Sequence, residues 1–240
     1  MMKLSEPQII EADGYKWWFH YGEDDHLALG GHETQLKPFF ESLNDKNKVY
    51  INVGAHVGTW AIRASAWAKE VWAIEANPKT YKTLKDNVEL NKLTSSVMPV
   101  LMAAWDDAKT PVTFVDVNGM ATGGSTRLER SEGGMITNTI DNLVAEFAHY
   151  SDFEIGFISS DVEGAEAHVF RGAKETVAKY RPNLLIEVHT GHPGVDEDLE
   201  DQLNEFLAEQ NYTISKIRLS PTAPYWICQP AELVEDYPSE

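Results

Sequence analysis

The chain has 240 residues, which is long enough for one α/β domain, and its hydrophobic content of 42% can supply a buried core. Its 20 Lys and Arg against 38 Asp and Glu give a formal net charge of −18, which repels phosphate backbones and anionic membrane surfaces. We therefore expect no nucleic-acid partner and no membrane association. The single cysteine, Cys228, excludes a disulfide within the chain, and the lack of a long apolar run or export signal predicts a cytoplasmic protein.

The first 48 residues differ in composition from the rest, because aromatic residues and histidines gather there. We expect residues 1–48 to form a small N-terminal cap or lid over the tips of the sheet. The alternative is that these aromatic side chains only cover an edge of the sheet. The residues in question are Tyr15, Trp17, Trp18, Phe19, His20, Tyr21, His26, His32, Phe39 and Phe40.

From residue 49 onward, segments typical of strands alternate with segments typical of helices. The parallel strands are predicted at 49–53, 71–74, 97–103, 153–159 and 184–188, and the helices at 59–69, 78–91, from 139 onward, at 162–180 and at 196–210. Short strands at 112–117, 126–128 and 135–137 predict a β insertion, and 212–219 with 225–228 a closing antiparallel pair. The pattern predicts one α/β domain over residues 49–240, built on a doubly wound, mostly parallel sheet of seven strands.

Two glycines follow the first predicted strand, where α/β proteins often bind cofactors. Gly54 and Gly58 lack a β-carbon, so backbone can pass close to a ligand at the strand tip, and the helix that opens near Gly58 points its free N–H groups at that ligand. Glu75 ends the second strand about 20 residues after Gly54, the interval at which an acidic side chain reaches a ribose hydroxyl. The spacing predicts a ligand with an adenosine-like ribose. A tight turn with no ligand is the alternative.

The glycine count indicates which ligand this is. Ala55, His56 and Val57 separate the two glycines, so the middle glycine of the dinucleotide fingerprint G-x-G-x-x-G is missing. A pyrophosphate then loses its close approach to the backbone, and a smaller ligand with an amino-acid tail fits better. S-adenosylmethionine is the candidate that these features favour, with a nicotinamide dinucleotide as the rival.

Ionisable residues follow the fourth and fifth predicted strands. They are Asp161, Glu163, Glu166, Glu187 and His189. Because the carboxyl ends of parallel strands meet at one edge of a sheet, we expect these side chains to converge. A structural alternative exists for part of the set, since Ser160 and Glu163 match the capping box S-x-x-E at the start of a helix.

Several segments together resemble the FkbM-type methyltransferases, which use S-adenosylmethionine and have the class I, Rossmann-like fold. The resemblance covers about residues 49–190. It is carried by INVGAHVG (51–58), AIEANP (73–78), NVELN (87–91), TIDNL (139–143), DVEGAE (161–166), GA (172–173) and RP to His189 (181–189). The chain departs from the family at Asn52, where an aspartate usually holds the ammonium of the cofactor, and at Ser159, where a lysine often stands.

The resemblance implies that residues 49–240 form an S-adenosylmethionine-dependent methyltransferase domain. It implies transfer of a methyl group to a hydroxyl of a sugar, glycan or natural product, so that the partner is a small-molecule or carbohydrate acceptor. A domain that binds the cofactor without catalysis is an alternative, and the oligomeric state is not predicted. The residues expected to bind the cofactor are Asn52, Gly54, Ala55, His56, Gly58, Glu75, Ala76, Ala104 and Asp161.

Methyl transfer from a sulfonium is an in-line displacement, so the protein mainly aligns the reacting atoms and excludes water. A hydroxyl is a poor nucleophile at neutral pH, and its proton has to be accepted as the bond forms. Asp161 is the first choice for this base, followed by His189, with Glu163 as a third catalytic candidate. As an alternative, Asp161, Glu163, Glu187 and His189 could hold Mg²⁺ or a similar cation that acidifies the hydroxyl.

Overall fold

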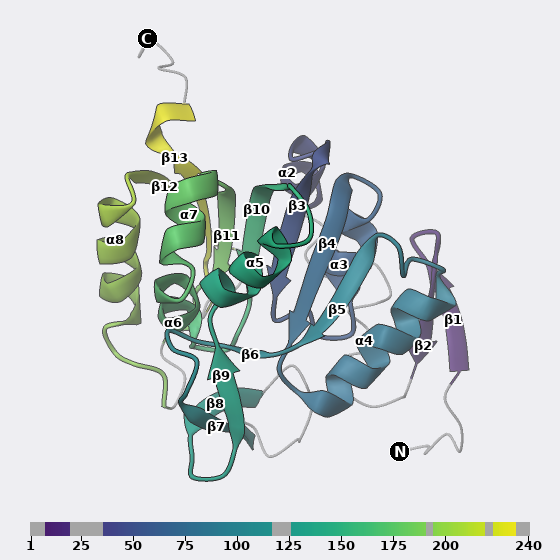
Figure 1. Cartoon of the computed structure of the whole chain (residues 1–240), viewed down its shortest axis with the longest axis horizontal. Coiled ribbons are helices and arrows are strands. Elements are labelled where there is room, and N and C mark those ends of the chain that lie inside the picture. The colour runs from purple at the N-terminus through teal and green to yellow at the C-terminus, as the bar shows by residue number, and fades with distance from the viewer. Residues whose placement is uncertain (1–7, 20–35, 117–125, 191–193, 219–222, 234–240) are drawn as a thin grey trace.

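A seven-stranded mixed sheet forms the centre of the protein in a computed structural model, which describes residues 8–19, 36–116, 126–190, 194–218 and 223–233 (Figure 1). The strands run in the order β12-β13-β11-β10-β3-β4-β5. Their bounds are Asp45–Val53 (β3), Ala68–Glu75 (β4), Val97–Leu101 (β5), Glu154–Ser160 (β10), Asn183–Glu187 (β11), Tyr212–Ile217 (β12) and Tyr225–Pro230 (β13). β13 runs opposite to the other six strands, which are parallel to one another, so the predicted α/β class with a mostly parallel sheet is confirmed.

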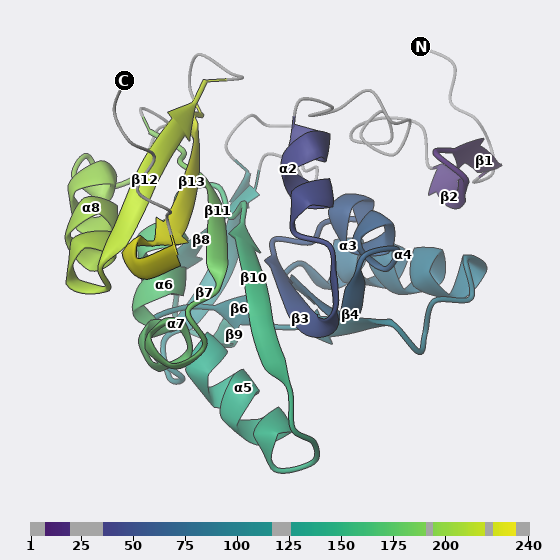
Figure 2. The ribbon, with the colours of Figure 1, turned by 90° about the horizontal axis from the view of Figure 1, so that it is seen from above.

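Helices cover both faces of this sheet (Figure 2). One face carries α2 (Lys37–Ser42), α3 (Thr59–Ala64) and α4 (Pro78–Leu90), and the other carries α5 (Ile140–Ala148), α6 (Glu166–Arg171), α7 (Lys174–Tyr180) and α8 (Leu199–Glu209). Side chains of a strand alternate between the two faces, which is why Ile51 and Val53 belong to one buried cluster and Tyr50 to the other. Asn52 points to the same face as Tyr50, and this places a polar group near α2 and α3.

The prediction of one helix over residues 162–180 is wrong in two respects. Its start lies later, because Glu163 and Gly164 have φ of 55° and 105°, outside the right-handed helical region, and α6 begins at Glu166. It is also two helices, separated at Gly172, where a β-carbon would overlap the carbonyl oxygen of Trp105. The chain therefore turns at a point where another segment crosses it closely.

The predicted β insertion is a separate four-stranded sheet of order β6-β9-β7-β8. Its strands are Ala103–Ala104 (β6), Pro111–Asp116 (β7), Thr126–Arg130 (β8) and Met135–Asn138 (β9). The strand predicted at 97–103 accordingly ends at Leu101, and the chain then enters this second sheet.

Part of the predicted N-terminal cap is described. Strands β1 (Gln8–Ala12) and β2 (Tyr15–Phe19) form a hairpin that docks on α4, where the side chains of Asn87 and Asn91 bond to the backbone of β2. His20, Tyr21, His26 and His32 lie outside the described residues. The short helix η3 (Ala231–Leu233) follows β13, and no helix in the described ranges is long and apolar enough to cross a bilayer.

Candidate active site

The glycine loop between β3 and α3 is shaped by contacts within the protein. The N–H groups of Gly54 and Ala55 both donate to the carbonyl oxygen of Ile74, at 2.9 Å each. Gly54 has φ +79°, and a β-carbon there would overlap the carbonyl oxygen of Asp161. Gly58 has φ +97° and closes against Leu84, whose Cδ1 would lie 2.8 Å from an added β-carbon. Both positions therefore require glycine for the turn and for close packing, whether or not a ligand binds, as expected from the alternative of a tight turn.

Glu75 ends β4, and its carboxylate holds the glycine loop through a hydrogen bond to the backbone. Its Oε2 accepts the N–H of His56 at 2.9 Å, and its Oε1 accepts the N–H of Asn77 at 2.8 Å. Burial raises the pKa of this carboxyl group above its usual range, although the two backbone donors oppose that shift. Each carboxylate oxygen has a second lone pair, so Glu75 can still accept a hydrogen bond from a ribose hydroxyl.

Asn52 lies inside a small buried network next to the loop. Its Nδ2 donates to Ser159 Oγ at 2.9 Å, and the hydroxyl of Tyr50 lies 2.5 Å from the same oxygen. Within the described part of the chain, Asn52 Oδ1 is buried without a hydrogen-bond partner. A buried acceptor of this kind normally finds a donor, and the ammonium of S-adenosylmethionine would supply one. Ser159, where the family often has lysine, serves here to orient Asn52.

A pocket opens at the carboxyl ends of β3, β10 and β11. It is lined by Phe40, Asn52, Gly54, Ala55, His56, Thr59, Trp60, Ser159, Ser160, Asp161, Leu185, Glu187 and Tyr225. Five of the predicted cofactor residues are among them. Gly58, Glu75, Ala76 and Ala104 are not, although Glu75 bonds directly to His56 in the pocket wall.

The lining residues that sequence reasoning did not assign to the site include three aromatic ones. Phe40 and Trp60 stack with ring centroids 3.9 Å apart, and the hydroxyl of Tyr225 donates to Glu187 Oε2 at 2.7 Å. Tyr225 reaches this place because β13 pairs with β11 so that Tyr225 lies opposite Glu187. The register of an antiparallel partner is not readable from either segment alone, whereas the aromatic content of residues 1–48 was a usable signal for Phe40.

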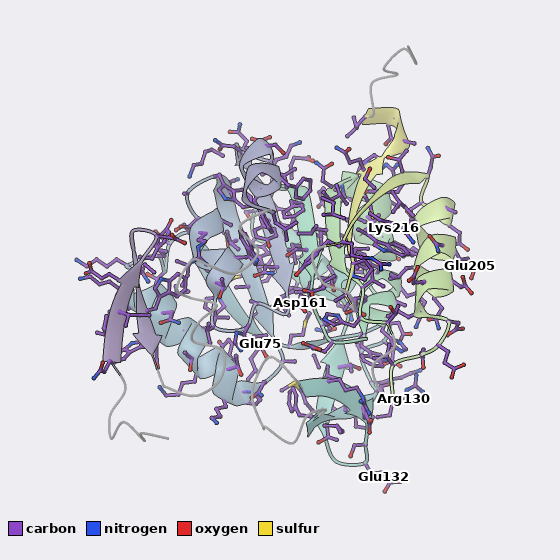
Figure 3. All side chains as sticks on the ribbon, turned by 180° about the vertical axis from the view of Figure 1, so that it is seen from behind. Glu75, Arg130, Glu132, Asp161, Glu205 and Lys216 are labelled. Atoms are coloured by element: carbon purple, nitrogen blue, oxygen red, sulfur yellow. The ribbon has the colours of Figure 1, made fainter. Side chains whose placement is uncertain are left out.

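The ionisable residues converge as predicted, around the imidazole of His189. Its Nδ1 lies 2.8 Å from Glu166 Oε1, and its Nε2 faces three further carboxylates. The distances from Nε2 are 3.7 Å to Asp161 Oδ1, 3.7 Å to Glu163 Oε2 and 3.9 Å to Glu187 Oε1. Asp161 follows β10 and Glu75 ends β4, the strands on either side of β3, so both residues lie at the same edge of the sheet (Figure 3).

The electrostatics of the cluster change the role expected for His189. Burial lowers its pKa, but the hydrogen bond and charge of Glu166, together with Asp161 and Glu163, outweigh burial and raise the pKa to about 10. In the protein without ligands, the imidazole thus carries its proton at neutral pH. This favours Asp161 over His189 as the proton acceptor.

The capping-box interpretation of Ser160 and Glu163 is wrong. The helix does not begin there, and Glu163 adopts a left-handed conformation with its carboxylate directed to His189. Glu166 bonds instead to the N–H of Gly164 and to His189, and it is fully buried. All three acids after β10, Asp161, Glu163 and Glu166, therefore lie against the imidazole.

Comparisons with known proteins agree with this architecture. The model of the methyltransferase FkbM domain matches residues 52–214. The tRNA (guanine(37)-N(1))-methyltransferase Trm5b of Methanocaldococcus jannaschii is 33% identical over 112 residues, which are 46% of this chain and 30% of that protein. The chain thus spans less than a third of the length of that curated relative.

Two solved structures share the fold. Methyltransferase FkbM from Methylobacillus flagellatus KT has a TM-score of 0.52 at 17% identity, covering 85% of this chain and 53% of that one. SMU.1697c of Streptococcus mutans, called a putative methyltransferase and solved with S-adenosylhomocysteine, has a TM-score of 0.50 at 15% identity, covering 81% and 94%.

These findings correct one expectation. The exclusion of nucleic acid, drawn from the net charge of −18, is wrong, because the curated relative at 33% identity is named as a tRNA methyltransferase. The physical reason is that net charge sums over the whole surface and does not fix the potential at one binding face. The family model covers well over half of the chain. A cofactor with an ammonium group also agrees with the buried Asn52 Oδ1 beside the glycine loop, which needs a hydrogen-bond donor. The chain belongs to the FkbM methyltransferase domain family, and its cofactor is S-adenosylmethionine.

Proposed function

We propose that this protein transfers a methyl group to a hydroxyl oxygen of an acceptor that enters beside Asp161. The observation that carries the proposal is that Asp161 lines the same pocket as Asn52, Gly54 and His56. A carboxylate therefore stands next to the residues that suit the amino-acid end of the cofactor. Its side chain is half exposed, so an acceptor can reach it.

The chain's own groups suggest how the cofactor is held. Asn52 Oδ1 accepts a hydrogen bond from the ammonium, and Glu75 accepts one from a ribose hydroxyl. Ala55 and His56 lie in the pocket wall between these two positions. Ala76 follows β4 and Ala104 ends β6, and we assign both to the side of the adenine. When bound, S-adenosylmethionine supplies an electrophilic methyl carbon on sulfur.

The remaining residues align the acceptor and accept its proton. As the acceptor oxygen bonds to the methyl carbon, the carbon–sulfur bond breaks and S-adenosylhomocysteine leaves. Asp161 takes the hydroxyl proton, a role worth about 10² to 10⁴ in rate. The stacked pair of Phe40 and Trp60 narrows the other side of the pocket and excludes water. Apolar rings opposite carboxylates suit a sugar or a hydroxylated natural product, which has both apolar and hydroxyl faces.

A second acceptor class is favoured by one specific observation. The 33% identity over 112 residues is to an enzyme named for methylating N1 of a guanine in tRNA. A ring nitrogen that carries a proton poses the same chemical demand as a hydroxyl, since its proton also has to be accepted. Asp161 would fill that role too.

The test has two stages, both on the full chain. Calorimetry with S-adenosylhomocysteine measures cofactor binding, and absence of binding would refute the proposal. Transfer of a labelled methyl group is then measured on sugars, hydroxylated natural products, free guanosine and tRNA. Product from a hydroxylated compound supports O-methylation, and product from tRNA alone replaces it with the second candidate.

The variant Asp161→Asn separates chemistry from binding. Asparagine keeps the size of the side chain and the backbone contacts of residue 161 with Val53 and Gly54. We expect turnover to fall at least about 100-fold while the affinity for S-adenosylhomocysteine stays near that of the wild type. Wild-type turnover in this variant would remove Asp161 from the mechanism.

A further inference from the structure

Three side chains from two strand ends place their ligand atoms within 4.8 Å of one another. They are Asp161 after β10, Glu187 at the end of β11, and His189 two residues later. An ion with bonds of about 2.1 Å separates neighbouring ligand atoms by about 3 Å and opposite ones by about 4.2 Å. The distances of 3.7 Å and 3.9 Å from His189 Nε2 to the Asp161 and Glu187 oxygens exceed the spacing of neighbouring ligand atoms by roughly 1 Å or less. Small rotations of the side chains would close the set around one ion.

An independent observation is the way in which His189 is held. Glu166 is 0% exposed, and its Oε1 lies 2.8 Å from His189 Nδ1 and also accepts the N–H of Gly164 at 3.1 Å. The imidazole itself is 5% exposed, so its ring orientation is fixed by packing. A buried carboxylate on one ring nitrogen, which leaves the other nitrogen directed at ligands, is the usual support of a metal-binding histidine.

A neutral oxygen completes the surroundings. Ser160 lies between β10 and Asp161, lines the same pocket as Asp161 and Glu187, and is 2% exposed. Its Oγ has no hydrogen-bond partner in the part of the chain that the structure describes. A buried hydroxyl without a partner is costly unless a ligand or water engages it.

Charge argues in the same direction. Four carboxylates, those of Asp161, Glu163, Glu166 and Glu187, surround one imidazole. Even with the imidazole protonated, the cluster has more negative than positive groups at short range. Like charges at such separations repel one another, and a divalent cation among them would offset that repulsion.

We propose that Asp161, Glu187 and His189 bind one divalent cation of the Mg²⁺ and Mn²⁺ class, with Glu163 as a further oxygen ligand. Three carboxylates and one imidazole suit a hard ion that tolerates a nitrogen ligand, and they contain no thiolate that would favour a softer one. The cation replaces the proton on His189 Nε2, which passes to solvent.

The role of the ion rests on the proposed function. Asp161 and Glu187 line the pocket where the acceptor enters, so a cation between them can bind the acceptor oxygen and lower the pKa of its hydroxyl. The hydroxyl proton then goes to the Asp161 oxygen that does not bind the ion, as the carbon–oxygen bond forms and the carbon–sulfur bond breaks. The ion would thereby specify an acceptor with an ionisable hydroxyl next to a second oxygen that can also reach the metal.

The experiment titrates the full chain with Mn²⁺ and measures the concentration of free Mn²⁺ at each step by electron paramagnetic resonance. We expect one bound Mn²⁺ per wild-type chain, displaced by Mg²⁺. The variants Glu187→Gln and Asp161→Asn each remove one ligand and should weaken binding at least about tenfold. Glu200→Gln is the matched control, because it also removes one negative charge but lies on the exposed face of α8, paired with Lys216. It should bind Mn²⁺ as the wild type does.

Calorimetry with S-adenosylhomocysteine on the same four proteins distinguishes the two possible failures and shows that each variant is folded. A wild-type protein that binds the nucleoside but not Mn²⁺ overturns the metal site and leaves the proposed function in place. Equal Mn²⁺ binding by all four proteins also overturns it, since surface acids would then be responsible. A wild-type protein that binds Mn²⁺ but no nucleoside refutes the proposed function and leaves the metal site standing.

Discussion

The carbonyl oxygen of Asp161 occupies the position that a β-carbon on Gly54 would need. The same two segments are joined by the N–H of Asp161, which donates to the carbonyl oxygen of Val53 at 3.1 Å. The loop that suits the cofactor and the carboxylate that faces the acceptor are therefore locked together at the tips of two adjacent strands. Their relative position is fixed by backbone, so the pocket does not depend on flexible side chains to bring them together.

The first prediction concerns the variant Gly54→Ala. An L-residue at φ +79° costs about 1–2 kcal/mol, and overlap with the Asp161 backbone should add about 1–3 kcal/mol. Urea unfolding of the variant measures the sum. Gly133→Ala is the matched control, because Gly133 has φ +81° but nothing lies within 4 Å of an added β-carbon. Equal losses of stability in the two variants would contradict the close approach of Gly54 to Asp161.

The second prediction concerns the variant Asn52→Asp. It places a carboxylate, with a negative charge, where Asn52 Oδ1 is buried without a partner in the described residues. The Ser159 hydroxyl, which now accepts from Asn52, can donate to the new carboxylate while still accepting from Tyr50, so the network survives. A charge-assisted hydrogen bond to the ammonium should tighten S-adenosylhomocysteine binding about tenfold. Methylthioadenosine lacks the amino-acid tail and should bind both proteins equally. An equal gain for both ligands would mean that Asn52 does not face the ammonium.

How far the sequence predicts the site follows from these strand tips. Apolar strand segments and their alternation with helices predict a mostly parallel sheet. Because parallel strands end at one edge, the sequence predicts that Asp161, Glu187 and His189 lie close together, as they do. No side-chain detail is needed for that inference.

The reason why residue 54 must be glycine differs from the predicted one. The sequence predicts a close approach of a ligand, whereas the close neighbour is the Asp161 backbone, whose position is set by tertiary structure.

Other features were beyond local pattern. Residues 162–180 have helical periodicity throughout, and only the crossing of Trp105 over Gly172 and the left-handed Glu163 divide them. Tyr225 enters the pocket through the register of an antiparallel strand, which depends on a partner about 40 positions away. Net charge, lastly, describes the whole surface and could not decide the class of acceptor.

The third prediction concerns the start of α7. Asp141, on the adjacent helix α5, accepts the N–H groups of Glu175 and Thr176 at 3.0 and 2.8 Å and also the Thr176 hydroxyl. Asp141→Ala removes this cap and should cost about 0.5–2 kcal/mol in urea unfolding, with S-adenosylhomocysteine affinity unchanged. Asp86→Ala, which breaks only an exposed pair with Lys82, should cost about 0.5 kcal/mol or less. A loss in Asp141→Ala no larger than in this control would show that the cap contributes little.

The fourth prediction is a pH dependence of cofactor binding that arises from Glu75. Burial raises the pKa of this carboxyl group, so it takes up a proton at a higher pH than an exposed glutamate does. A ribose hydroxyl that donates to the carboxylate stabilises the ionised form and so lowers the pKa in the complex. Linkage then requires that binding release a proton near the pKa of the free protein. Affinity for S-adenosylhomocysteine should fall as the pH is lowered through that pKa, and it should level off at higher pH where Glu75 is already ionised.

Calorimetry across a pH series, in buffers with different heats of ionisation, measures both the affinity and the protons released. In Glu75→Gln we expect binding about tenfold weaker at neutral pH and the Glu75 proton release lost, because an amide cannot ionise and can satisfy only one of the N–H groups of His56 and Asn77. Glu70→Gln is the control on the same strand, since the Glu70 carboxylate accepts from the Trp72 ring nitrogen and from no other group in the described residues, and this variant should keep the wild-type profile. An unchanged profile in Glu75→Gln would show that another group governs the pH dependence and that the carboxylate serves only to hold the loop.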